Sequence, residues 1–353
     1  MFIINGLLMN KLELTVAERI FHFKQPAGTS RGVYLTRRSW MVEAKNPDMP
    51  QRVGIGECAP LPLLSCDDLD DYEGILKNIC RHVEEVGCLD DDLLLPYPSM
   101  RFGLEMALMR LEAGGDVIFD TPFSKGEMGI PINGLVWMGA YDEMLKRMEE
   151  KIEDGFRCVK LKIGAIDFES ELNLVKIIRN RFGRDDIELR LDANGAFSPL
   201  VAMERLEKLA QFDIHSIEQP IRQGQWKEMA RICTESPIPI ALDEELIGVN
   251  SLAEKEELLA VIKPAYIILK PSLHGGFKGT EEWIALAEQR GIGSWITSAL
   301  ESNVGLSAIA QFAAYIYGCP LKMPQGLGTG QLFEDNIQMP LDIVGDKLYY
   351  LPK

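Results

Sequence analysis

The chain has 353 residues, of which 46% are apolar and 25% are charged, a composition typical of a folded protein with about two structural units. Its formal net charge of −16 repels phosphate backbones and anionic lipid headgroups, which excludes nucleic acid and membrane surfaces as expected partners. No stretch approaches the ~18 uncharged apolar residues of a transmembrane helix.

The cysteines and the N-terminal residues indicate in which cellular compartment the protein is expected. The seven cysteines are irregularly spaced and include no Cys-x-x-Cys pair, so neither a zinc site nor a disulfide framework is indicated. Reduced thiols are typical of the cytoplasm, and residues 1–9 lack the basic start of a secretory signal. We therefore expect a cytoplasmic protein, whose oligomeric state the sequence does not determine.

The N-terminal part of the chain favours strands followed by helices. A turn-prone stretch at residues 25–32 separates the first two β-rich segments, and a third strand begins at Gly54 and runs into a Pro-rich loop. This order predicts an α+β domain, to which we assign residues 1–128. The predicted strands are residues 12–23 and 32–42, and the predicted helices are residues 70–85 and 99–112.

From Ile130 onward, short apolar runs alternate with amphipathic helical segments, which predicts a parallel sheet with crossover helices. Seven or more units of about 25–30 residues favour closure of this sheet into a barrel, assigned to residues 129–330. The runs are residues 131–138, 158–163, 187–192, 215–218, 238–243, 266–270 and 293–297, and helical segments include residues 141–154, 170–181, 199–211 and 280–289.

The alternation stops after Gly330. Residues 339–344 and 347–351, joined by Gly345-Asp346, resemble a final hairpin. We expect this tail, residues 331–353, to pack back on the N-terminal domain.

Charged residues end five successive runs at intervals of about 25–30 residues, the length of one strand–helix unit. Because side chains alternate along a strand, charges two residues apart point the same way, and the carboxyl ends of barrel strands are where catalytic groups lie. The residues are Lys160 and Lys162 on the second run, Arg190, Asp192 and Asn194 on the third, Glu218 on the fourth, Asp243 on the fifth and Lys270 on the sixth.

Each of these motifs alone is an ordinary strand end or helix cap. Together they are not, because unpaired charges in a barrel mouth cost several kcal/mol each unless they hold a metal or an anion. Three carboxylates without histidine or cysteine form a hard oxygen site that suits Mg²⁺. A substrate carboxylate on that ion would place its neighbouring carbon between the lysines of the second and sixth strands, while the ion neutralises developing negative charge.

These residues resemble the pattern of the enolase superfamily, in which a Lys or His base acts beside Mg²⁺. The resemblance implies an α+β capping domain over a TIM-like (β/α)7β barrel. It also implies Asp192, Glu218 and Asp243 as ligands of Mg²⁺, for which Mn²⁺ can substitute, and Lys162 and Lys270 as the catalytic lysines. The Lys-x-Lys pair is similar to that of the muconate lactonizing subgroup.

Within that subgroup, residues 26–32, 56–61 and 298–305 resemble the o-succinylbenzoate synthases. That resemblance implies a dehydration in menaquinone biosynthesis, from 2-succinyl-6-hydroxy-2,4-cyclohexadiene-1-carboxylate to o-succinylbenzoate. The substrate is a small dianion. The contacts expected for it are Lys160, Arg190, Asn194, Ser298 and Arg31.

Three other functions use the same residues. An N-acylamino acid racemase or dipeptide epimerase needs a lysine on each face of the α-carbon, although residues 325–330 lack the Asp-x-Asp that dipeptide epimerases carry at strand eight. A Schiff-base aldolase would use Lys162 or Lys270 covalently. A non-catalytic binding protein on the same scaffold is the third.

Overall fold

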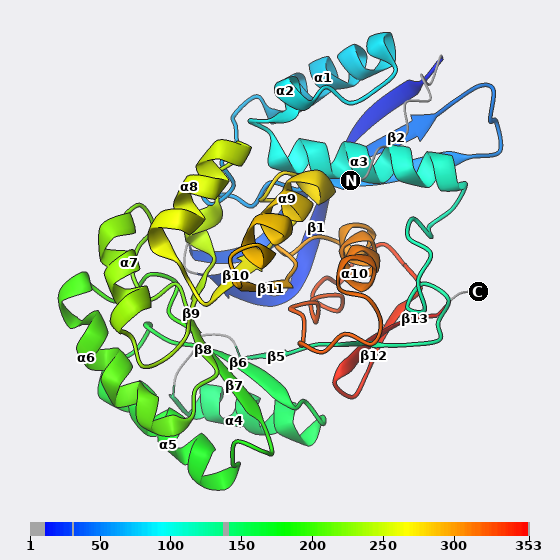
Figure 1. Cartoon of the computed structure of the whole chain (residues 1–353). Helices are drawn as coiled ribbons and strands as arrows, with labels where there is room; N and C mark the ends of the chain where they lie inside the picture. The colour runs from blue at the N-terminus through cyan, green and yellow to red at the C-terminus, as the bar shows by residue number, and fades with distance from the viewer. Residues whose placement is uncertain (1–10, 30–31, 137–140, 352–353) are drawn as a thin grey trace.

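The structure is a computed structural model that describes residues 11–29, 32–136 and 141–351 (Figure 1). In Figure 1 the N-terminal elements, blue to cyan, lie along one side of a larger α/β part coloured green to orange. Within the described residues, no helix combines the length and the apolar character needed to cross a membrane. The cysteines are all free thiols, in agreement with their irregular spacing.

The N-terminal strands form an antiparallel sheet in the order β1 (Glu13–Thr29), β2 (Gly32–Lys45) and β3 (Val53–Cys58). The prediction of a turn from residue 25 was wrong, because β1 continues to Thr29 and pairs with β2 beyond an irregularity between His22 and Ala27. A bulge leaves backbone groups out of the ladder and so tolerates Pro26, which has no N–H to donate.

Three helices follow the sheet: α1 (Tyr72–Val86), α2 (Asp91–Leu94) and α3 (Pro98–Ala113). Helix α3 crosses β3 at close range because two strand positions are glycine. A Cβ at Gly54 would lie 1.8 Å from the Ala107 carbonyl oxygen, and one at Gly56 would lie 1.8 Å from that of Gly103. Since α3 also packs on α9, it joins the N-terminal sheet to the α/β part.

The α/β part contains a seven-stranded parallel sheet whose strands lie in chain order, with connecting helices on one face. This confirms the predicted alternation, except that the run at 131–138 is divided between β4 and β5. The strands are β5 (Gly134–Val136), β6 (Cys158–Lys162), β7 (Glu188–Asp192), β8 (Ser216–Glu218), β9 (Ile240–Leu242), β10 (Tyr266–Leu269) and β11 (Gly293–Ile296). The helices are α4 (Tyr141–Glu153), α5 (Phe168–Arg181), α6 (Pro199–Leu209), α7 (Trp226–Glu235), α8 (Leu252–Ile262), α9 (Gly276–Glu288) and α10 (Asn303–Tyr317), with short 3₁₀ turns η1 (Ala210–Phe212) and η2 (Glu244–Leu246).

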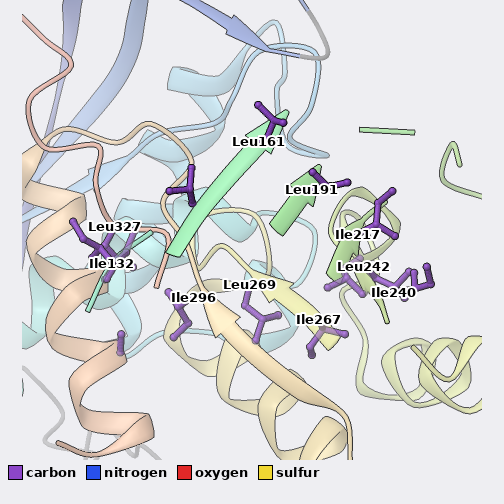
Figure 2. Close-up of a cluster of buried hydrophobic side chains, with 14 of the residues drawn as sticks. Ile132, Leu161, Leu191, Ile217, Ile240, Leu242, Ile267, Leu269, Ile296 and Leu327 are labelled. Atoms are coloured by element: carbon purple, nitrogen blue, oxygen red, sulfur yellow. The ribbon is translucent and has the colours of Figure 1, made fainter. Parts of the chain in front are cut away.

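The two faces of this sheet differ sharply in polarity. Leu161, Leu191 and Ile217 belong to the large apolar core shared with the helices (Figure 2). The residues that alternate with them, such as Lys160, Asp192 and Glu218, belong to the opposite face. The outer face of the curled sheet is therefore apolar, and its inner face is charged on β6 to β8 and apolar at Ala241, Ile268 and Trp295 on β9 to β11.

A short eighth segment meets both edges of the sheet. Gln325 forms a parallel bridge to Ile132 beside β5, and Gly326 forms one to Thr297 at the end of β11. The backbone N–H of Asn133 donates to the Gln325 carbonyl at 3.0 Å, and that of Gly326 donates to the Ile296 carbonyl at 2.9 Å. Backbone hydrogen bonds thus link the first and seventh strands through residues 325–326.

The C-terminal residues contact both parts of the molecule. Strands β12 (Leu341–Val344) and β13 (Lys347–Tyr350) form the predicted hairpin, and β13 pairs with β4 (Ile130–Pro131). Before the hairpin, residues 332–334 lie along β1, where the Lys24 N–H donates to the Leu332 carbonyl at 2.9 Å.

Candidate active site

A cavity of about 340 Å³ lies at the carboxyl ends of the parallel strands. Its size suits a small organic molecule. The N-terminal part contributes apolar lining through Leu61 and Leu64. Helix α4 and β1 contribute Arg147, Glu150, Lys151 and Gln25. The other charged and polar lining comes from the sheet and its loops and includes Lys160, Lys162, Asp192, Asn194, Glu218, Asp243, Glu244, Lys270, Ser298 and Thr329.

Lys160 on β6 bridges two carboxylates on the next two strands. Its Nζ donates to both oxygens of Glu218 at 3.0 and 2.8 Å and lies 3.0 Å from Asp192 Oδ2. Asp192 and Glu218 are direct neighbours in the β7–β8 ladder. Burial by itself lowers the pKa of Lys160, but the surrounding carboxylates, Asp192 first, outweigh burial and raise that pKa above its ordinary value.

Lys162, two residues further along β6, lies beside the same carboxylate. Its Nζ donates to Asp192 Oδ2 at 2.7 Å and to Asn194 Oδ1 at 2.6 Å. Asn194 in turn donates through Nδ2 to Glu244 Oε1 at 2.9 Å. The backbone of Asn194 has a positive φ of 43°, a conformation that asparagine tolerates better than most residues. Glu244 therefore orients Asn194, and Asn194 orients the Lys162 ammonium.

Lys270 reaches the cavity from the other side of the carboxylates. It follows β10 directly, and its Nζ donates to both oxygens of Asp243. Its backbone N–H donates to His274 Nδ1 at 2.9 Å, which holds the turn after the strand. Since β7, β8 and β9 lie between β6 and β10 in the sheet, Lys162 and Lys270 flank the acidic residues.

The three carboxylates differ in how well the lysines compensate them. Burial raises the pKa of Asp192, but Lys160 and Lys162 outweigh burial, and the net pKa lies below its ordinary value. Lys270 likewise outweighs burial and lowers the pKa of Asp243. The pKa of Glu218 is instead raised well above its ordinary value, by burial and then by repulsion from Asp192. The pKa of Glu218 is therefore raised even though the Lys160 ammonium donates to both of its oxygens.

A divalent cation fits this cluster. Because Lys160 Nζ lies within 3.0 Å of both Asp192 and Glu218, one small cation in its place reaches both carboxylates. All the donors are oxygens, which Mg²⁺ prefers. Within the described residues no three His, Cys, Asp or Glu side chains are already gathered as a metal cage, since lysine ammonium groups stand between the acids.

The structure separates the five residues expected to contact substrate. Lys160, Asn194 and Ser298 line the cavity, where Ser298 Oγ lies 2.6 Å from Thr329 Oγ1. Arg31 lies outside the described residues.

Arg190 lies two residues before Asp192 on β7, and therefore one side-chain layer closer to the amino ends of the strands than Asp192 does. Its guanidinium donates to Glu188 at 2.7 Å and to the Pro324 carbonyl at 3.1 Å and stacks 4.4 Å from the Trp295 ring centroid. Strand alternation gave Arg190 the correct face, but Glu188, Pro324 and Trp295 hold its guanidinium away from the cavity, although Lys160 at the same register lines it.

Two residues of the site were missed. Gln219 follows Glu218 and is fully buried beneath the loop that carries Asp243. Glu244 lines the cavity, and burial, followed by repulsion from Asp243, raises its pKa to about 7. Strand alternation predicts that Glu244 points away from Asp243. It does not, because β9 ends at Leu242 and the chain enters a 3₁₀ turn, so the acidic pair itself was the available signal.

Known proteins resemble this chain over most of its length. The family described as Enolase C-terminal domain-like matches residues 143–344. An o-succinylbenzoate synthase of Desulfotalea psychrophila is 44% identical over 96% of this chain and 99% of its own length. The crystal structure of MenC from the same organism has a TM-score of 0.81 at 40% identity, covering 96% of this chain and 100% of that chain.

A second, more distant resemblance is to an epimerase. The L-Ala-D/L-Glu epimerase of Bacillus subtilis is 26% identical over 74% of this chain and 74% of its own length. Its substrate-liganded structure has a TM-score of 0.80 at 20% identity, covering 97% of this chain and 96% of that chain, a likeness of fold.

Proposed function

Since the chain belongs to the enolase superfamily, we propose that it catalyses the o-succinylbenzoate synthase reaction, a dehydration that converts 2-succinyl-6-hydroxy-2,4-cyclohexadiene-1-carboxylate to o-succinylbenzoate in menaquinone biosynthesis. The observation that carries this proposal is the placement of Lys162 and Lys270 on either side of one buried carboxylate cluster, in a chain with 44% identity to such a synthase.

Asp192, Glu218 and Asp243 hold a divalent cation, Mg²⁺ with Mn²⁺ as a substitute. The raised pKa of Glu218 supports this assignment, because burial and then repulsion from Asp192 disfavour its charged form, which a bound cation would stabilise. When bound, the ion supplies Lewis-acid neutralisation of the charge that develops on a substrate carboxylate.

Lys162 acts as the base and then as the acid. As the neutral amine, it removes the proton from the ring carbon that bears the carboxylate and becomes the ammonium, and the electron pair of that C–H bond forms the new ring double bond. As the C–O bond breaks, Lys162 returns the proton to the departing hydroxyl on the same face, so that water leaves and the ring becomes aromatic. The hydrogen bond from Lys162 to Asn194 keeps the ammonium near that face.

Lys270 stabilises the developing negative charge from the opposite face. Its ammonium is held by Asp243, on the far side of Glu218 from Lys162. A fixed positive charge in a buried site stabilises a developing anion far better than it would in water. Lys160, Asn194 and Ser298 complete the polar lining that contacts the dianion.

The architecture that supports this chemistry is a closed (β/α)7β barrel, residues 129–330, capped by residues 1–128. Closure is supported by the bridges of Gln325 to Ile132 and of Gly326 to Thr297. The tail, residues 331–353, joins the two domains. Two contacts support this: Leu332 bonds to β1 of the N-terminal domain, and β13 pairs with β4 of the barrel domain.

The direct test is a spectroscopic assay for the aromatic product. Wild type is expected to turn over the cyclohexadiene substrate with Mg²⁺ and to stop when EDTA is added. Lys162→Ala and Lys270→Ala are expected to lose at least about a thousandfold in kcat, because each removes a group that acts on the reacting carbon. Lys227→Ala, an exposed lysine on α7, is the matched control. Undiminished turnover in either variant refutes the assignment.

The epimerase relative keeps racemisation as a second candidate, since two opposed lysines also serve proton removal and return at one carbon. Incubation of N-acylamino acids and dipeptides in D₂O separates the two. Deuterium uptake without loss of water, together with no aromatic product from the cyclohexadiene, would favour the epimerase or racemase reaction.

A further inference from the structure

Arg37 on β2 is a buried charge that holds two distant loops together. Only 1% of its surface is exposed. Its guanidinium donates to the carbonyls of Pro60 and Ala59, the latter at 2.6 Å. It also donates to the carbonyls of Leu300 at 3.3 Å and Ala299 at 3.4 Å. One planar group therefore ties the loop after β3 to the loop after β11.

Both tied loops are walls of the cavity. Leu61 and Leu64 line it from the first loop, and residues 298–300 line it from the second. The first loop belongs to the N-terminal part and the second to the α/β part, so the width of the cavity between them depends on how the two parts are held. Arg37 joins them without lining the cavity itself.

The second loop needs such support because of its backbone. Leu300 has a φ of 63°, a left-handed conformation that side chains other than glycine and asparagine rarely adopt. Strained residues of this kind persist only where surrounding contacts hold them in place. Here the Leu300 carbonyl accepts from Arg37, and the N–H of Ala299 donates to Glu301 Oε2 at 2.7 Å.

Two buried carboxylates balance the charge of Arg37. Glu301 and Glu57 are its main electrostatic partners. Glu301 also accepts a hydrogen bond from Ser272, and Glu57 accepts the N–H of Ser302 at 2.9 Å. The guanidinium is thus free to use its donors on carbonyls. A lysine has three donors on one atom, and they cannot reach carbonyls on both loops in one plane.

We propose that Arg37 is a positioning residue that holds loops 59–64 and 298–300 together as one wall of the cavity and so determines affinity for the part of the substrate remote from the reacting carbon. This inference rests on the proposed function, because it takes the same cavity as the substrate site. The catalytic lysines and the acidic cluster belong to β6 to β10, apart from these loops.

The test is the steady-state kinetics of Arg37→Lys with the cyclohexadiene substrate. KM is expected to rise about tenfold while kcat stays within about threefold of wild type, since binding away from the reacting centre is lost and the chemistry is not. The affinity for Mg²⁺, measured by calorimetry, is expected to stay unchanged. A KM equal to that of wild type, or a fall in kcat alone, overturns the proposal.

Arg110→Lys is the matched control. Arg110 on α3 is also buried and also joins the two parts, by donating to the carbonyls of Ile55 and of Val304, the latter at 3.1 Å. It touches neither wall loop in these contacts. The Arg110→Lys variant is expected to lower the unfolding temperature as Arg37→Lys does, but to leave KM unchanged. An equal rise in KM for both variants would reduce Arg37 to a structural role and overturn the proposal.

If Arg37→Lys does not fold, as judged by circular dichroism, Glu301→Gln replaces it. This variant keeps Arg37 but removes the negative charge of its main electrostatic partner. KM is expected to rise several-fold with kcat retained, and an unchanged KM overturns the proposal. Failure of the proposed function would give a different result from failure of the Arg37 proposal, because wild type itself would then form no aromatic product.

Discussion

The side-chain oxygen of Gln219 accepts the backbone N–H of Asp243 at 3.2 Å. Gln219 follows Glu218 in the chain, so one amide couples the end of β8 to the end of β9. The same oxygen accepts the N–H of Glu245 at 3.2 Å, and Nε2 donates to the Ile221 carbonyl at 3.0 Å. Gln219 also has a positive φ of 40°, which marks a backbone held against its preference.

We predict that Gln219→Met weakens Mg²⁺ binding. Residues that hold metal ligands in place typically contribute about 10- to 100-fold to metal affinity, so the Kd is expected to rise by about tenfold or more. Titration calorimetry with Mg²⁺ measures it. Gln223→Met, an exposed position in the next loop, is the control and is expected to bind as wild type does. An unaltered Kd in a folded Gln219→Met protein would contradict the coupling.

Asn194→Ala is expected to lower kcat by roughly tenfold, with a smaller rise in KM from the lost contact with the substrate. The amide joins Glu244 to Lys162, and without it the ammonium keeps its hydrogen bond to Asp192 but loses the one that links it to Glu244. Loss of orientation at a catalytic group lowers the rate of the chemical step more than it lowers binding. Asn173→Ala on α5 is the comparison. A rise in KM with kcat unchanged would show that Asn194 serves substrate contact alone and does not orient the base.

Magnesium is expected to raise the unfolding temperature of wild type. A ligand that binds only the folded state stabilises it by about 2.7 kcal/mol when present at a hundred times its Kd. Glu218→Gln removes one of the expected ligands and should abolish most of this increase, whereas Glu228→Gln on the exposed face of α7 should retain it. Differential scanning calorimetry with and without Mg²⁺ measures the increase in unfolding temperature for each protein. A full increase in Glu218→Gln would remove Glu218 from the metal site.

The stability of the contact between α3 and α9 is expected to fall as pH rises from about 5 to about 8. Glu105 on α3 accepts the N–H of Phe277 at 2.6 Å, and burial raises the pKa of this carboxyl from 4.5 to about 7. Between those values the folded state binds more protons than the unfolded state, so increasing pH favours unfolding.

Urea unfolding at about pH 5.5 and about pH 8 measures this effect, and Glu105→Gln is expected to reduce the difference between the two midpoints. Glu112→Gln, exposed on the same helix, should leave the difference as in wild type. An identical pH dependence in Glu105→Gln would assign the effect to other groups.

Much of the site follows from local rules that the sequence displays directly. Strand residues alternate faces, so Lys160 and Lys162 were expected on one side, and both line the cavity. Asp192, Glu218 and Asp243 recur once per strand–helix unit, and a parallel sheet with strands in chain order brings such positions to one edge. These expectations need only the backbone period and the order of elements.

Other features depended on contacts that no local pattern contains. The length of β1 was set by a bulge opposite β2, and the direction of Glu244 by the point at which β9 ends. The direction of the Arg190 guanidinium was set by its contacts with Glu188, Pro324 and Trp295. Arg37 in the sequence is one more strand arginine, and only the folded chain places it between two loops more than two hundred residues apart. Periodicity determines which face a side chain takes, but packing between distant segments determines its depth and partners.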